Sequence, residues 1–373
     1  MIETLSLAYG AAAAWRRRWY ARDPTRRRSL ARAVVSVGNL RIGGSGKTPV
    51  VEYIARLLLE SGERPAVLTR GYGRRHAADG VTVVSDGSVV RGGLDESGDE
   101  PLMLAQALPG VAVLVGGDRY LSGLLAERRL GATVHVLDDG FQHLELNRDV
   151  DLLLVAEDDL DDRPLPAGRL RERIAAAAAA DAALVTAGYE TAAERIARAL
   201  GVTTVFRVTR TIGAPRMVAG SRDTVVVPAN SRVFVVTGIA RPDRFMSDVS
   251  SAGWDIAGSM TFRDHHRFNA RDVRRIRDAA RAASSAIVLT TEKDAVRLTA
   301  CDLDDLPIAA VPLIVGVEPA IAFRAWLLDR IRSVHRAPRI QHPAPSTQHP
   351  APSTQHPAPS TQRPAPSPGP SRK

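Results

Sequence analysis

The sequence predicts an α/β fold: a mostly parallel, helix-covered sheet around a P-loop-like turn, with a second, smaller α/β domain. One observation is that apolar, strand-like runs such as PAVLTRG, VAVLVGG and VDLLLVA alternate with segments of helical spacing. The intervening segments are mostly long enough for the crossovers that parallel strands need. The other is a glycine-rich turn between the β-branched run at residues 34–37 and an amphipathic segment after residue 48.

The glycine-rich turn reads GNLRIGGSGKT and departs from the usual phosphate-loop pattern, because Arg41 stands six residues before the lysine, where that pattern has glycine. Its glycines still permit positive φ and a close approach of backbone N–H groups to an anion at a helix N-terminus. A turn that binds nothing is the alternative, but Gly-Lys-Thr at a strand-to-helix junction favours a nucleotide site. The candidate nucleotide-binding residues are Gly43, Gly44, Ser45, Gly46, Lys47 and Thr48.

Lysine is rare in this chain, since Lys47, Lys293 and Lys373 are the only lysines among fifty basic residues. Nearly all of the remaining basic positions hold arginine. A lysine that persists therefore marks a place where a planar guanidinium cannot replace a compact ammonium. Lys293 lies in TTEKDAVRL and is therefore expected to join the nucleotide site, with chance survival as the alternative. Lys373 is the last residue and carries no such weight.

The N-terminal segment combines an apolar stripe with eight arginines between residues 15 and 32. Trp15 and Trp19 stand beside these charges, as in a helix that lies on an anionic leaflet. The uncharged run is too short to span a bilayer, which takes roughly 20 residues. Its charges follow the apolar run, unlike those of a signal peptide. A helix packed on the protein's own core and a nucleic-acid-binding arm are the alternatives.

Adjacent carboxylates follow the strand-like run VHVLDDGFQH. Asp138 and Asp139 would lie at the carboxyl end of a parallel strand, where open α/β sheets bind ligands. Together with the Thr48 hydroxyl they could hold Mg²⁺, or they could simply be solvated. The segment GRLRER adds Arg171 and Glu172, in which the arginine either neutralises a transferring phosphoryl group or belongs to a solvated face.

Two further segments carry groups suited to acid–base chemistry. Asp99 lies in SGDEPLML and, taken alone, is typical of a helix cap. FRDHHRF contains Asp264, His265 and His266, but further ligand spacing and nearby cysteine are absent. Acid–base work or phosphate contact is therefore favoured over a metal site. The single cysteine, Cys301, excludes an intramolecular disulfide framework and suits the cytosol.

The segments VGNLRIGGSGKTP, GDEPLML, DDGFQHLELNRD, GRLRE, TGIARPDRF, FRDHHRF and TTEKDAV occur in this order. Over roughly residues 34–330 this set closely resembles the tetraacyldisaccharide 4'-kinase family, the lipid A 4'-kinases of Gram-negative bacteria. The resemblance implies two α/β domains with the site in the cleft between them. It also implies ATP-dependent phosphorylation of the 4'-hydroxyl of an acylated glucosamine disaccharide 1-phosphate, giving lipid IVA. The enzyme would act peripherally on the anionic leaflet at the cytoplasmic face of the inner membrane.

The resemblance also implies roles for individual residues. Lys47 and Thr48 would serve the phosphates of ATP and Mg²⁺, whereas Asp99 and His265 would act together on the acceptor hydroxyl. An imidazole beside Asp99 could orient it, share the proton and bring the effective pKa closer to neutrality. The remaining candidates are Asp138, Asp139 and Glu172 as metal ligands or groups supporting them, and Arg171 as a charge stabiliser.

The same reading divides the chain into four parts. Residues 1–32 form a membrane-associating helix and basic linker, 33–228 a P-loop kinase domain, and 229–336 a second α/β domain that closes the cleft. Residues 337–373 repeat QHPAPST and predict a disordered tail, which has no expected counterpart in the family. Family members usually have prolines around the arginine-glutamate motif, where this chain has Arg169 and Arg173.

Two other classes of function remain as alternatives. A P-loop NTPase that acts as a switch or metallochaperone should lack an acceptor-activating pair, so Asp99 with His265 argues against it. A basic nucleic-acid-binding protein would suit the net charge of +9, but aromatic residues make up only 5% of the chain and no nucleic-acid motif is present. The sequence thus predicts a kinase with ATP and Mg²⁺ and without a nucleic-acid partner.

Overall fold

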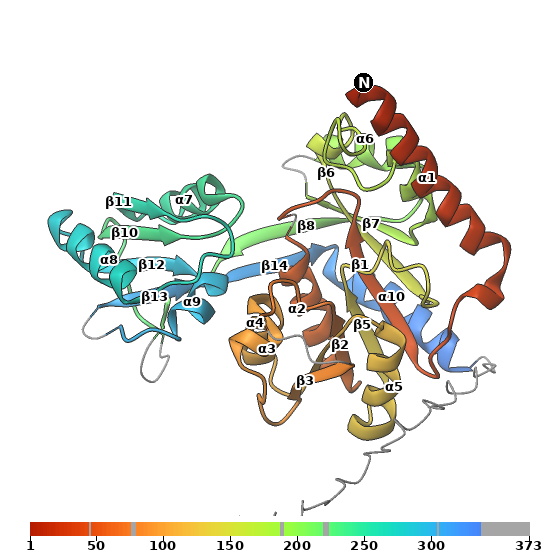
Figure 1. Cartoon of the computed structure of the whole chain (residues 1–373), viewed down its shortest axis with the longest axis horizontal. Coiled ribbons are helices and arrows are strands. Elements are labelled where there is room, and N and C mark those ends of the chain that lie inside the picture. The colour runs from red at the N-terminus through yellow and green to blue at the C-terminus, as the bar shows by residue number, and fades with distance from the viewer. Residues whose placement is uncertain (45, 76–79, 187–189, 219–223, 304–305, 337–373) are drawn as a thin grey trace, which may run out of the picture. The chain divides into compact units, whose positions relative to one another are not determined.

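The structure is a computed structural model that describes residues 1–336 apart from residues 45, 76–79, 187–189, 219–223 and 304–305. The predicted repeat tail, residues 337–373, therefore lies outside the described residues. The described strands form a nine-stranded and a five-stranded sheet, with helices packed on both (Figure 1). The predicted α/β class is confirmed.

The nine-stranded sheet has the order β14-β8-β7-β6-β1-β5-β2-β4-β3. Neighbours are parallel except at its two edges, where β14 and β3 run antiparallel to β8 and β4. In chain order its strands are β1 (Ala33–Asn39), β2 (Pro65–Thr69), β3 (Val81–Asp86), β4 (Ala112–Gly116), β5 (Val134–Asp138), β6 (Val150–Ala156), β7 (Ala182–Thr186), β8 (Val205–Ile212) and β14 (Leu313–Glu318).

Helices cover both faces of this sheet, because its central strands are apolar on both sides. The central strand β1 is buried along its whole length. Apolar residues of three helices share one core with Val35 and Val37 of β1, and those of two others pack on the opposite face. The first set comprises α2 (Lys47–Glu60), α4 (Asp99–Ala107) and α10 (Ala320–Arg336), and the second α5 (Arg119–Leu130) and α6 (Glu190–Leu200).

The five-stranded sheet has the order β11-β10-β12-β13-β9, and all its pairs are parallel except that of β9. Its strands are β9 (Arg216–Met217), β10 (Arg232–Thr237), β11 (Asp255–Thr261), β12 (Ile287–Thr291) and β13 (Ile308–Val311). The helix α8 (Ala270–Ala282) packs on one face and α7 (Pro242–Ser251) on the other. The short helix α9 (Glu292–Leu298) contributes Val296 to the core of the first sheet and Leu298 to that of the second.

The grouping of the strands differs from the predicted division at residue 228. β9 precedes that residue and belongs to the second sheet, whereas β14 and α10 follow it and pack with the first. The reason is that β8 leads the chain out of the nine-stranded sheet and β14 returns to it, paired with β8 in antiparallel register from Leu313–Ile212 to Glu318–Arg207. Such a pairing of distant segments leaves no mark in local sequence patterns.

The N-terminal segment forms α1 (Ile2–Arg22), as predicted. Small residues face the rest of the chain: the Ser6 hydroxyl donates to the Pro164 carbonyl at 2.6 Å, and a Cβ on Gly10 would lie 3.0 Å from the Arg173 side chain. Large apolar side chains on the same helix stay exposed, Leu7 at 62% and Trp15 at 65%. The helix therefore packs on the protein and also leaves apolar surface uncovered.

Candidate active site

The turn between β1 and α2 has the backbone of an anion-binding loop. Gly43 and Gly46 have φ of 89° and 83°, backbone angles that residues with a Cβ rarely adopt. A Cβ added to either glycine would meet no atom within 4 Å. Open space thus adjoins the loop where α2 begins, at Lys47. The positive end of the helix dipole and the N–H groups at the start of a helix favour an anion there. Ser45 lies outside the described residues.

Arg41, which breaks the usual pattern, has a structural explanation. Its guanidinium is buried and donates to Asp158 at 3.0 Å and to Asp159 at 2.8 Å. Both carboxylates follow β6, so the arginine ties the start of the loop to the neighbouring strand. In place of the missing glycine, the loop therefore has an arginine that fixes its start to the segment after β6.

The Lys47 side chain is held at the base of the loop. Its ammonium donates to Oδ1 of Asn39 at 3.0 Å and lies 3.4 Å from Oδ1 of Asp139. Arg171 makes two hydrogen bonds with the Asp139 carboxylate, at 2.8 and 3.0 Å, and a third with Oδ1 of Asn39 at 3.0 Å. Asn39 and Asp139 thus hold two cations side by side, and half-buried Thr48 follows in the first turn of α2.

Asn39 was not singled out by the sequence analysis. It ends β1 and is fully buried. Because lysine and arginine can only donate, the amide oxygen must face them, which leaves the buried Nδ2 without a partner among the described residues. The sequence signal that could have identified Asn39 is its position, as a polar side chain at the carboxyl end of the strand that precedes the loop.

The two adjacent carboxylates behave differently. Burial alone would raise the pKa of Asp139, but Lys47 and Arg171 hold it below its ordinary value. Burial, reinforced by the charge of Glu100, raises the pKa of Asp138 to about 7. The positive charges of Lys47 and Arg119 offset this rise only in part, and a bound cation would stabilise the carboxylate further.

The donors near the loop suit Mg²⁺ that is shared with phosphates. No three His, Cys, Asp or Glu side chains within the described ranges lie close enough together to hold a metal ion by themselves. Mg²⁺ bound to a nucleotide usually takes only one or two carboxylates and leaves its other positions to phosphate and water oxygens. Thr48 and Asp138 fit that pattern, but Asp139 does not, because both of its oxygens accept hydrogen bonds from Arg171.

Glu172 does not fit a metal site, contrary to expectation. Both of its oxygens accept hydrogen bonds from Arg17 of α1 at 2.7 Å, and the side chains are only 6% and 13% exposed. The Arg17 guanidinium also lies over the Phe141 ring, 4.3 Å from its centroid. The carboxylate therefore has no oxygen left for a cation and instead joins α1 to the rest of the chain.

Asp99 and His265 are brought together by elements that belong to different sheets. Asp99 begins α4 and is 4% exposed, and His265 lies in the loop after β11 with φ of 58°. Nδ1 of His265 lies 2.9 Å from Oδ2 of Asp99. The cap role is minor, since among the described residues the only backbone N–H that donates to the Asp99 carboxylate is that of Glu100 next to it.

The electrostatic surroundings of this pair differ from the sequence-based expectation. Burial would raise the pKa of Asp99, but the hydrogen bond with His265 and the charges of Lys293 and Arg297 bring it below its ordinary value. The expected shift towards neutrality is therefore wrong for Asp99. The hydrogen bond with Asp99 instead raises the pKa of His265, against burial and the charge of Lys293.

Lys293 lies beside this pair. Its ammonium is 3.1 Å from Oε1 of Glu100, 3.2 Å from Nε2 of His265 and 3.6 Å from Oδ1 of Asp264. Burial would lower the pKa of Lys293, but Glu100, Asp99 and Asp264 raise it, so the side chain carries its charge. The contacts of this lysine are thus with the acid–base pair.

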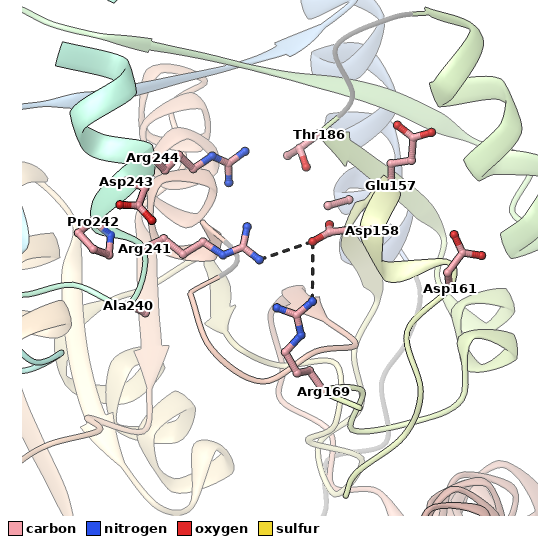
Figure 2. A pocket seen from close by; sticks show the side chains of 11 residues that line it. Glu157, Asp158, Asp161, Arg169, Thr186, Ala240, Arg241, Pro242, Asp243 and Arg244 are labelled. Carbon is pink, nitrogen blue, oxygen red and sulfur yellow. Dashed lines mark ion pairs between the residues drawn. The ribbon is translucent and has the colours of Figure 1, made fainter. Parts of the chain in front are cut away.

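A pocket of about 840 Å³ is lined by residues at or after the carboxyl ends of the parallel strands β6, β7 and β10 (Figure 2). Asp158 is its central carboxylate, 3.6 Å from Arg241 and 3.9 Å from Arg169. At the loop itself, a Cβ on Gly44 would lie 3.6 Å from the Ala240 methyl group. Residues after β10 therefore line the pocket and border the loop.

Comparisons with known proteins agree on one family. The family model described as tetraacyldisaccharide-1-P 4'-kinase matches residues 1–332. The tetraacyldisaccharide 4'-kinase of Geobacter metallireducens is 39% identical over 301 residues, which cover 80% of this chain and 88% of the relative. That of Syntrophus aciditrophicus is 34% identical over 353 residues, 89% and 93% of the two chains. A crystal structure of LpxK from Aquifex aeolicus in complex with ATP is 30% identical, covers 88% of this chain and 98% of its own, and has a TM-score of 0.72.

Proposed function

The chain belongs to the tetraacyldisaccharide 4'-kinase family, and from this premise we propose how its residues carry out the reaction. The activity is ATP-dependent phosphorylation of the 4'-hydroxyl of tetraacyldisaccharide 1-phosphate in lipid A biosynthesis. The observation that carries the proposal is the hydrogen bond between Asp99 and His265. A switch or metallochaperone would have no use for such a pair beside a phosphate loop.

The phosphates of ATP bind at the loop between β1 and α2. Gly43, Gly44 and Gly46 let backbone N–H groups approach the phosphate oxygens, and Lys47 supplies a compact positive charge. Asn39 and Asp139 hold that ammonium, and Arg171 shares both of its partners. Thr48 and Asp138 would hold Mg²⁺ when it is bound with the nucleotide, and the ion would supply positive charge that offsets that of the phosphates.

The nucleoside and the acceptor lie on opposite flanks of the loop in this proposal. β5 and β6 are the two neighbours of β1 in the sheet. Asp138 ends β5 and feels the charge of Glu100, the residue after Asp99, which supports an acceptor site on that flank. The pocket of about 840 Å³ at the end of β6 supports the nucleoside on the other.

Asp99 and His265 act on the acceptor hydroxyl. As the acceptor oxygen bonds to the γ-phosphorus, the bond from that phosphorus to the bridging oxygen of ADP breaks, and the hydroxyl proton passes to the Asp99–His265 pair. Phosphoryl transfer depends mainly on positioning and charge stabilisation, so a base of modest strength suffices. Closure of the two α/β regions around this point would exclude water.

Peripheral binding to the anionic inner-membrane leaflet would bring the enzyme to its acylated acceptor. None of the described helices is long and apolar enough to cross a bilayer. The helix α1 instead exposes Leu5, Leu7 and Trp15 beside arginines, a combination that suits the lipid interface.

The experiment that tests the proposed function is a transfer assay. Full-length protein, detergent, Mg-ATP and tetraacyldisaccharide 1-phosphate are incubated, and the product is identified by mass spectrometry. The expected result is a bis-phosphorylated product that forms far more slowly with Asp99→Ala. Hydrolysis of ATP at the same rate with and without the acceptor, with no lipid product, would overturn the proposal.

A further inference from the structure

Lys293 stands out because an ammonium has been kept there in a chain whose other basic residues are almost all arginine. It extends from α9 to a point between α4 and the loop after β11, and its side chain is 18% exposed. The three donors of the ammonium face Glu100, His265 and Asp264. An ammonium can turn its donors towards three separate partners, whereas the donors of a planar guanidinium are fixed in one fork.

The contact with His265 decides where the proton of the imidazole lies. A lysine ammonium can only donate, so Nε2 of His265 must accept at 3.2 Å. The proton of the neutral ring is then on Nδ1, from which it is donated to Asp99 at 2.9 Å. An imidazolium would turn Nε2 into a donor that faces the ammonium, which is unfavourable.

We infer that Lys293 is a positioning residue that fixes the Nδ1-protonated tautomer of His265 and so keeps Asp99 as the proton acceptor of the pair. This inference rests on the proposed function, in which the pair acts on the acceptor hydroxyl. It assigns the lysine to the acid–base pair and not to the nucleotide. It also makes the pair depend on contact between α9 and α4.

The charged and titratable groups around the pair come from four segments. Removing the lysine leaves three carboxylates around the pair with one remaining cation, so the pKa values of Asp99 and His265 both rise. These groups are Asp99 and Glu100 of α4, Asp264 and His265 of the loop after β11, Lys293 and Arg297 of α9, and Tyr72 of the loop after β2, whose ring lies beside that of His265.

The first test is ¹⁵N NMR of histidine-labelled full-length protein, with the His265 resonances assigned by comparison with His265→Gln. At alkaline pH, where the ring is neutral although its pKa is raised, we expect protonation at Nδ1, and loss of that single-tautomer signature in Lys293→Met. A wild-type ring protonated at Nε2 would overturn the inference, and this measurement does not depend on how well any lysine variant folds.

The second test is the pH profile of kcat with Mg-ATP and tetraacyldisaccharide 1-phosphate. Lys293→Met should lower kcat at least about 10-fold and move the acid limb up by about one pH unit, with KM for ATP within about 2-fold. Lys293→Arg should keep the acid limb near the wild-type position, because the charge remains. Arg267→Met is the matched control: it removes a cation that pairs with Asp95 nearby but has no contact with His265.

The outcomes separate this inference from the proposed function. An unshifted acid limb in Lys293→Met, or a rise confined to KM for ATP, would overturn the role of Lys293. The proposed function would still stand if Asp99→Ala loses activity. Full activity of Asp99→Ala would overturn both. A shift as large in Arg267→Met as in Lys293→Met would show a general charge effect and would also overturn the inference.

Discussion

Nδ1 of His265 and Oδ2 of Asp99 lie 2.9 Å apart although 166 positions separate the two residues in the chain. The histidine is carried by the five-stranded sheet and the aspartate by a helix of the nine-stranded one. The pair therefore exists only when the two α/β regions are in contact.

Removing either member of this pair should reduce turnover without eliminating it. We expect Asp99→Ala and His265→Ala each to lower kcat by roughly 10² to 10⁴-fold, the usual range for general acid–base catalysis, because positioning and charge stabilisation remain. Affinity for ATP should change little. Steady-state kinetics in detergent micelles measures both quantities.

The double variant checks that the two residues act as a unit. It should be scarcely slower than the slower single variant, because the second substitution removes nothing that still functions. Losses that multiply would show two independent contributions, contrary to the proposed pair.

Lys47→Arg should nearly abolish phosphoryl transfer although it keeps the positive charge. The ammonium fits between Asn39 and Asp139, and a planar guanidinium is too wide for a phosphate cradle. The rate of product formation is the measurement. Arg56→Lys, on the exposed side of the same helix, is the control and should keep wild-type turnover. The cradle would have to be reconsidered if Lys47→Arg kept most of its activity.

The ion pair between Arg17 and Glu172 should be important for stability. Arg17→Met leaves a buried carboxylate without its partner, which typically costs about 3 to 5 kcal/mol, whereas Arg17→Met with Glu172→Leu should recover much of that loss. Denaturant unfolding measures both. Arg16→Met, which breaks an exposed pair with Glu145, should cost less than about 1 kcal/mol. Equal losses for the two arginine variants would contradict a buried pair.

Glu292 should make the protein less stable as the pH rises. Burial and the nearby charge of Glu52 raise the pKa of Glu292 from 4.5 to about 7. Between these values the folded state binds more protons than the unfolded state, so stability falls with pH until about 7, by at most about 3 kcal/mol.

Glu292→Gln should flatten that dependence and still accept the hydrogen bond that Leu313 N–H donates to Glu292 at 3.2 Å. Denaturant unfolding at pH 5 and pH 8 gives the comparison. Glu318→Gln, in an exposed pair with Arg207, is the control and should keep the wild-type slope. A wild-type slope in Glu292→Gln would place the titrating group elsewhere.

Exposed aromatic residues on α1 should contribute to membrane binding. We expect Trp15→Ser with Trp19→Ser to weaken sedimentation with vesicles of anionic lipid while the melting temperature stays unchanged, since these side chains are 65% and 40% exposed. Trp326→Phe, in a helix packed on the first sheet, is a control for loss of tryptophan. Unchanged partitioning of the α1 variant would favour a helix that serves only to pack on the protein.

The parts of the site that are local in sequence could be predicted from sequence. Strand, glycine-rich turn and helix follow one another, so the loop with Lys47 and Thr48 was predicted from a single stretch. The pairing of Asp99 with His265 came from the family resemblance, since nothing local points to it. The rarity of lysine singled out Lys293 for the nucleotide site, whereas its position beside His265 depends on how α9 meets α4.

Other features depend on contacts that no sequence pattern records. Glu172 was predicted to serve the metal, and only the packing of α1 shows that Arg17 takes both of its oxygens. Arg41 departs from the usual loop pattern, and only the structure shows that Asp158 and Asp159 accept hydrogen bonds from it. A buried charge is understood only with its partner, and such partners here lie more than a hundred residues away.

The scarcity of lysine has a practical consequence for labelling. Apart from Lys373 at the end of the chain, the side-chain amines are those of Lys47 and Lys293, with side chains 13% and 18% exposed at the two halves of the proposed reaction centre. An amine-selective reagent followed by cleavage at the abundant arginines would report on each half in a separate peptide. Protection by nucleotide and protection by lipid could then be read independently from one digest.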